Sequence, residues 1–180
     1  MSGWTVDQTH PARVARHIAL GWERHLCDAR RVGTIAGSST AEIDAPIDRV
    51  WALVEDVETA SDWQGGLKAL RELDRDDQGR ALLCESESDA KVRTVKSTVR
   101  FTYDGPTVLT WRQEKGELKS VDGSWSLEDL GGGRTRATYD LEVELGRMLG
   151  MVIRGPLVDL LRGTLVGSRA GELKRAVEGG

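Results

Sequence analysis

Apolar and polar residues alternate over most of the chain between residues 80 and 145, and this is its strongest pattern. Every second residue from Ala137 to Leu145 is apolar, and the residues between them are polar. Residues 95–103 and 123–127 alternate in the same way. Successive side chains of a strand point to opposite faces, so this period predicts an antiparallel sheet with one apolar face and one wet face.

Turn-forming residues divide the alternating region into strands. Gly105-Pro106 and the glycines at 131–133 are the clearest breaks, and short turns between successive strands predict an antiparallel meander. The predicted strands cover residues 35–44, 67–73, 80–88, 91–103, 107–115, 118–129 and 134–145.

Two short helices are expected between the first two strands, over residues 46–56 and 58–63. Pro46 suits the first turn of a helix, where its missing N–H has no partner to lose. Apolar residues then recur at helical spacing from Val50 to Val57, with charged residues on the other side.

A long helix from about Leu149 to Val177 is expected to cover the apolar face of the sheet. At helical spacing its sheet-facing side carries large apolar residues as far as Leu161 and small residues after it. The small residues are explained either by close helix–sheet packing or by a void left for a ligand. The residues of this helix that the second explanation places at the void are Leu160, Leu161, Thr164, Gly167 and Ser168.

The aromatic residues are the other candidates for a cavity wall. Six of them are tryptophans, against two tyrosines and one phenylalanine. Tryptophan and tyrosine combine an apolar ring with a polar group, which suits a pocket for an aromatic or amphipathic ligand. The alternative is that each is an ordinary core residue. The predicted wall residues are Trp63, Phe101, Tyr103, Trp111, Trp125 and Tyr139.

Composition excludes several classes of protein. The net charge of −4 argues against a nucleic-acid surface, which requires a clustered basic face. No apolar run reaches spanning length, and the first residues do not resemble a secretory signal. Cys27 and Cys84 form no C-x-x-C pair, which favours reduced thiols and a cytoplasmic location.

Residues 1–33 differ from the rest and are expected to form an N-terminal extension, helical or poorly ordered. They contain all three histidines and five arginines against three acidic residues. Val14, Ile18, Trp22 and Leu26 would form one narrow apolar stripe on a helix. The alternatives are a membrane-surface helix, an arm for a homodimer or protein partner, a helix lying on the domain, or an upstream extension outside the native protein.

No constellation of catalytic or metal-binding residues stands out. Every histidine lies outside the predicted domain, so we expect no metal, no cofactor and no Ser–His or Cys–His nucleophile there. A basic run at Lys91, Arg93, Lys96 and Arg100 is expected to be a solvated face. Acid–base chemistry would need strand charges that point inward, although most of these are expected to face water. The charges considered are Glu85, Glu87, Lys96, Arg112 and Asp122.

Four features together resemble the START-like (SRPBCC, polyketide cyclase/dehydrase-like) superfamily. They are Ile43-Asp44-Ala45-Pro46 with Val50-Trp51 and Val54, Asp56-Val57 followed by Trp63, Gly123-Ser124-Trp125-Ser126-Leu127, and a last strand that leads into a long helix. The resemblance covers residues 34–178. It implies an α+β helix-grip fold over residues 34–180, with a curved antiparallel sheet of about seven strands around the C-terminal helix.

The resemblance implies ligand binding without naming the ligand. We expect a hydrophobic or aromatic small molecule (a lipid, a quinone or a polyketide-like compound) between the sheet and the last helix. One alternative is a polyketide cyclase or dehydratase that uses the same cavity. Another is a protein-interaction module without a ligand. If the protein is an enzyme, the sequence does not identify its catalytic residues.

Overall fold

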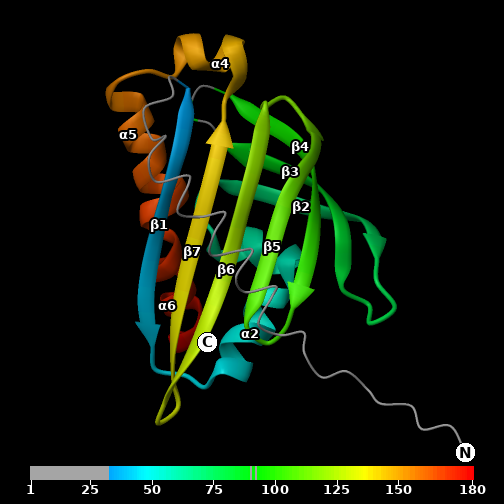
Figure 1. Ribbon diagram of the computed structural model, residues 1–180, viewed down its shortest axis with the longest axis vertical. Coiled ribbons are helices and arrows are strands. Elements are labelled where there is room, and N and C mark those ends of the chain that lie inside the picture. Colours follow the sequence, from blue (N-terminus) through cyan, green and yellow to red (C-terminus); the bar gives the residue numbers. More distant parts are fainter. Residues whose placement is uncertain (1–32, 90, 92) are drawn as a thin grey trace, which may run out of the picture. The chain divides into compact units, whose positions relative to one another are not determined.

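The computed structural model describes residues 33–89, 91 and 93–180. A seven-stranded antiparallel sheet has the order β1-β7-β6-β5-β4-β3-β2, and helices lie along one of its faces (Figure 1). This confirms the predicted α+β helix-grip architecture. The strands are β1 (Thr34–Ile43), β2 (Leu67–Arg75), β3 (Ala81–Asp89), β4 (Thr94–Asp104), β5 (Val108–Gly116), β6 (Ser120–Gly131) and β7 (Arg134–Glu144).

The alternation that predicted the strands matches the burial of their side chains. In β7 every second residue from Thr135 to Val143 is buried, and the residues between them are partly exposed. β4 follows the same rule from Val95 to Phe101. Trp125 of β6 lies opposite Tyr139 of β7 in the register, so both rings belong to the inner face.

The two short helices predicted after the first strand are confirmed. They are α2 (Ile47–Glu55) and α3 (Ala60–Trp63), joined by the 3₁₀ turn η1 (Val57–Thr59). Val50 and Val54 of α2 are buried. Arg49 of the same helix donates to the Val177 carbonyl at 2.8 Å, which ties α2 to the end of the chain.

The helix predicted as one unit from about Leu149 is interrupted. Its parts are α4 (Gly146–Val152), α5 (Pro156–Arg162), the π-helical turn η2 (Gly163–Gly167) and α6 (Arg169–Glu178). Gly155 has a φ of 57°, outside helical geometry. Pro156 lacks the N–H that would bond the Val152 carbonyl, so it starts a new helix. The covering helix therefore begins at Pro156.

The π-helical turn changes which side of the helix faces the sheet. The Ser168 N–H donates to the Gly163 carbonyl at 3.1 Å, five residues back instead of four. One extra residue in a turn rotates everything that follows by roughly 100°. The buried side after the turn consists of Arg169, Ala170, Leu173 and Val177.

Apart from Gly33, the predicted N-terminal extension over residues 1–33 lies outside the described residues, and it stays a prediction. The three histidines and Cys27 lie there as well. Among the helices that are described, none is both long and apolar enough to span a bilayer.

Candidate ligand-binding cavity

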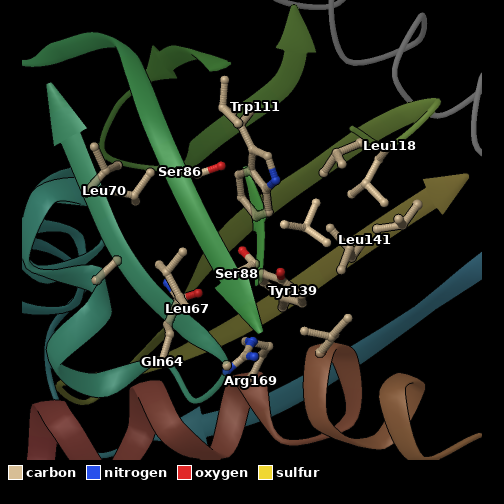
Figure 2. A pocket seen from close by; sticks show the side chains of 18 of the residues that line it. Gln64, Leu67, Leu70, Ser86, Ser88, Trp111, Leu118, Tyr139, Leu141 and Arg169 are labelled. Atoms are coloured by element: carbon tan, nitrogen blue, oxygen red, sulfur yellow. The ribbon is translucent and has the colours of Figure 1, made fainter. Parts of the chain in front are cut away.

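A cavity of about 160 Å³ lies between the inner face of the sheet and the helical segment α5–α6 (Figure 2). Most of its wall is apolar. Strands β1 to β7, the turn η1, the start of α3 and residues 161–169 all contribute to it. The apolar lining residues are Ile35, Val54, Val57, Ala60, Leu67, Leu70, Val95, Val99, Phe101, Leu109, Trp111, Leu118, Val121, Trp125, Leu141, Val143, Leu145, Leu161 and Leu165.

Five of the predicted wall residues form a continuous chain of aromatic rings. The ring centroids of Phe101 and Trp111 are 6.5 Å apart, and those of Trp111 and Tyr139 are 5.5 Å apart. Tyr139 meets Trp125 edge-on at 4.8 Å, and Trp125 lies 6.2 Å from Trp63. Four of these rings, all except Trp63, line the cavity. The alternation of the strands explains this, because it places all four on one face.

Trp63 and Tyr103 lie outside the cavity lining. Trp63 packs against Trp125, and its buried Nε1 has no hydrogen-bond partner among the described residues. The Tyr103 hydroxyl donates to the Ala81 carbonyl at 2.7 Å. The Arg80 guanidinium lies 4.5 Å from the centre of the Tyr103 ring. These contacts give Tyr103 a packing role.

Of the five predicted helix residues, the structure brings only Leu161 to the cavity. Leu160 is 55% exposed and Gly167 is exposed as well. The Thr164 hydroxyl donates to the Leu160 carbonyl at 3.0 Å, and Ser168 donates to the Thr164 carbonyl at the same distance. This cavity is therefore not lined by the small residues of the helix.

The π-helical turn brings Arg169 to the cavity instead of Ser168, and Leu165, four residues after Leu161, lines it in place of Thr164. Arg169 is only 2% exposed. Its guanidinium donates to the Gly65 carbonyl and pairs with Glu172, whose carboxylate also accepts the Gly65 N–H at 3.2 Å. Sequence reasoning missed this residue, because charged side chains are mostly exposed and nothing in the local pattern marks this one as buried. The one sequence signal for a paired Arg169 is that Glu172 follows three residues later, a spacing at which two helical side chains can interact.

The polar groups of the cavity are few. Besides Arg169 they are Gln64, Ser86, Ser88, Asp89 and Tyr139, from the end of α3, β3 and β7 (Figure 2). The Ser86 hydroxyl donates to the Ser97 carbonyl at 3.1 Å, so its oxygen remains an acceptor. Asp89 accepts the Lys91 N–H at 2.7 Å, and this bond lowers the pKa of the carboxyl group.

Two groups that titrate at high pH are buried on the inner face. Burial raises the pKa of Tyr139 to about 12, although the nearby Arg169 acts in the opposite direction. The Tyr139 phenol is therefore neutral and able to donate at physiological pH. Burial also raises the pKa of the Cys84 thiol to about 11. A protonated, buried thiol is a poor nucleophile.

The strand charges considered for acid–base chemistry form ion pairs away from the cavity lining. Lys96 contacts Glu87 at 2.9 Å, Arg71 contacts Glu85 at 3.5 Å, and Arg112 contacts Asp122 at 2.6 Å. Arg112 is 80% exposed. The part of the chain that is described contains no group of three His, Cys, Asp or Glu residues suited to a metal ion.

Solved structures with this fold include proteins of different kinds. A START superfamily protein from Mycobacterium smegmatis matches with a TM-score of 0.69 and 22% identity, over 80% of this chain and 97% of its own. An aromatase/cyclase, ZhuI from Streptomyces sp. R1128, matches with a TM-score of 0.65 and 16% identity, over 81% and 94%. A protein from Thermus thermophilus matches with a TM-score of 0.64 and 20% identity, over 79% and 98%.

The TM-scores of these matches show that the fold is shared. No curated protein matches the chain. Residues 43–166 match the polyketide cyclase / dehydrase and lipid transport family, and this chain belongs to that family.

Proposed function

We propose that the protein binds a small molecule with an apolar ring system and an anionic or carbonyl oxygen, in the cavity between the sheet and α5–α6. The observation that carries this proposal is a buried guanidinium, Arg169, at a wall that is otherwise mainly apolar. The aromatic chain would remove the ring from water. Hydrogen bonds from a charged donor are stronger than neutral ones, so Arg169 would orient the oxygen.

The size of the cavity narrows the ligand class. About 160 Å³ is close to the ~150 Å³ cavity that holds one benzene molecule and below the ~300–1,000 Å³ of pockets for drug-sized ligands. This supports a ligand with one or two rings. A lipid or a long polyketide chain would need the helices to move away from the sheet.

A cyclase or dehydratase is the second candidate, and Tyr139 favours it. Its neutral phenol and the Arg169 guanidinium are neighbours at the cavity, so one carbonyl oxygen could accept hydrogen bonds from both. Two such donors stabilise the negative charge that develops on an enolate oxygen. Structural relatives include an aromatase/cyclase. A cytoplasmic location, lipid binding and a homodimer or protein partner through residues 1–33 stay predictions.

Native mass spectrometry of the freshly purified protein, with extraction of any bound compound, is the first experiment. We expect a bound aromatic acid or carbonyl compound. Titration calorimetry then compares 2-naphthoate with 2-naphthamide, which share a ring system and differ in charge. Naphthoate is expected to bind about tenfold more tightly, and Arg169→Gln should remove that preference. Equal affinities in both proteins would contradict a role for Arg169 in ligand binding.

Two substitutions test the location of the site. Val121 lines the cavity, so Val121→Phe should fill it and abolish naphthoate binding. Gly167→Leu is the matched control, because Gly167 is exposed and an added Cβ would meet only the Arg162 carbonyl, 4.0 Å away. Unchanged binding in Val121→Phe would place the site elsewhere. A bound compound that loses water during incubation would favour the enzyme.

A further inference from the structure

Helix α4 is apolar on both of its sides. Leu149, and Ile153 just after the helix, are 6% and 1% exposed and hold it against the domain. Met148, Met151 and Val152 on the other side are 78%, 62% and 62% exposed. A helix with apolar residues on both sides is normally buried, and none of the described residues covers the outer side of α4.

The exposed apolar residues of the domain are concentrated at this place. Within the described residues, five large hydrophobic side chains are exposed, and four of them lie between Met148 and Leu160 on α4 and α5. The fifth, Leu73, lies on β2. Figure 1 shows α4 at one end of the domain, beyond the end of β7, with α5 following it along β1. We call Met148, Met151, Val152 and Leu160 the apolar tip.

The charge around the apolar tip is opposite to that of the whole protein. Residues 146–162 contain Arg147, Arg154 and Arg162 and a single acidic residue, Asp159, a net charge of +2 in a chain of −4. Arg147 and Arg154 are exposed on either side of the apolar residues of α4. Apolar side chains between arginines are typical of helices that lie in a bilayer surface with anionic headgroups.

We propose that the apolar tip docks on an anionic phospholipid bilayer, with the methionines and Val152 among the acyl chains and the arginines at the phosphates. A second copy is a poorer occupant, because a two-fold interface would bring like-charged arginines together. The arginine-rich residues 1–33 are also positively charged and have the same disadvantage.

The apolar tip is next to the cavity in the chain. Leu145 precedes α4 and Leu161 follows Leu160, and both line the cavity. Docking would bring this wall to the membrane surface. The inference that an apolar ligand enters or leaves there rests on the proposed function, whereas the docking itself does not.

Vesicle sedimentation of the full chain tests the docking without any ligand. Vesicles contain either phosphatidylcholine alone or equal amounts of phosphatidylcholine and phosphatidylserine. The protein is expected to sediment with the mixed vesicles, and less in high salt. Met148→Ser/Met151→Ser/Val152→Thr should reduce that binding at least about tenfold, because the lost apolar surface no longer inserts. Leu73→Ser is the matched control and should bind like the wild type.

The outcomes distinguish this proposal from its rivals. Thermal unfolding shows whether the triple variant is folded, and Arg147→Gln/Arg154→Gln, which keeps the apolar residues, should lose only the preference for phosphatidylserine. Wild-type-like binding by the triple variant would assign membrane binding to another region and overturn the proposal. Absence of binding to either vesicle would also overturn it. A dimer in light scattering that the triple variant abolishes, without vesicle binding, would replace the bilayer with a second copy.

Discussion

The two faces of the sheet use their polar residues in opposite ways. On the inner face a few buried polar groups lie among aromatic rings, and the Arg169 side chain of α6, which lies against this face, is 3% exposed in its pair with Glu172. On the outer face ion pairs are numerous, and the Arg112 side chain is 80% exposed in its pair with Asp122. Water competes for an exposed pair and cannot reach a buried one. The same kind of contact should therefore have very different consequences on the two faces.

Trp125→Ala should produce the largest loss of stability. Trp125 is 1% exposed and contacts both Tyr139 and Trp63, so its removal leaves a hole in the aromatic chain. We expect the free energy of unfolding to fall by about 4 kcal/mol, measured by urea denaturation. Trp125→Phe, which keeps a ring, should lose clearly less. A loss below about 1 kcal/mol for the alanine variant would show that the inner face tolerates cavities.

Arg169→Met should have the next largest effect, about 3 kcal/mol of the free energy of unfolding. The substitution removes the partner of Glu172 and the donor to the Gly65 carbonyl, and leaves a carboxylate almost without solvent. Glu172→Leu in the same chain should recover part of the loss, because no lone charge then remains. A double-mutant cycle from urea denaturation measures the coupling. Additive effects would show that Arg169 and Glu172 do not stabilise the fold as a pair.

The groups buried on the inner face should also make the folded domain less stable at alkaline pH. Burial raises the pKa of Tyr139 to about 12 from an ordinary value near 10, so the unfolded state releases this proton first. The stabilisation is complete below pH 10 and disappears as the pH rises through about 12, a loss of about 2–3 kcal/mol. Burial raises the pKa of Tyr103 and Cys84 as well, with the same sign. Urea denaturation from pH 8 to pH 11 measures the slope, which Tyr139→Phe should reduce. An equal slope in that variant would exclude Tyr139 as a cause.

The inner face of the sheet could be predicted from the sequence because its signal is local. A strand has a period of two residues, so the alternation alone predicts that Phe101, Tyr103, Trp125 and Tyr139 lie on the apolar face of the sheet. Whether Trp63 and Tyr103 reach the cavity could not be predicted from this pattern. Their position along the cavity depends on the curvature of the sheet and the path of α3, which no short pattern encodes.

The helix side of the cavity could not be predicted, because one extra residue in the turn at Gly163–Gly167 rotates the rest of the helix. Helical spacing selected Thr164 and Ser168, and the structure has Leu165 and Arg169 in the lining instead. Nothing in the local sequence except the two glycines indicates such a turn. A buried arginine contradicts the general expectation for charged residues, and its partners at Gly65 and Glu172 become apparent only in three dimensions.

The ion pair of Arg112 and Asp122 on the outer face should contribute least to the free energy of unfolding, and its weakness sharpens the contrast between the two faces. The Arg112 Nε and an Asp122 carboxylate oxygen are 2.6 Å apart, as close as in a strong ion pair, yet the two side chains are 80% and 44% exposed. A double-mutant cycle with Arg112→Gln and Asp122→Asn should give a coupling below about 0.5 kcal/mol, and moderate salt should reduce it further. Urea denaturation of the four proteins is the measurement. A coupling as large as that of Arg169 and Glu172 would mean that short distance, and not exclusion of water, determines the strength of ion pairs in this domain.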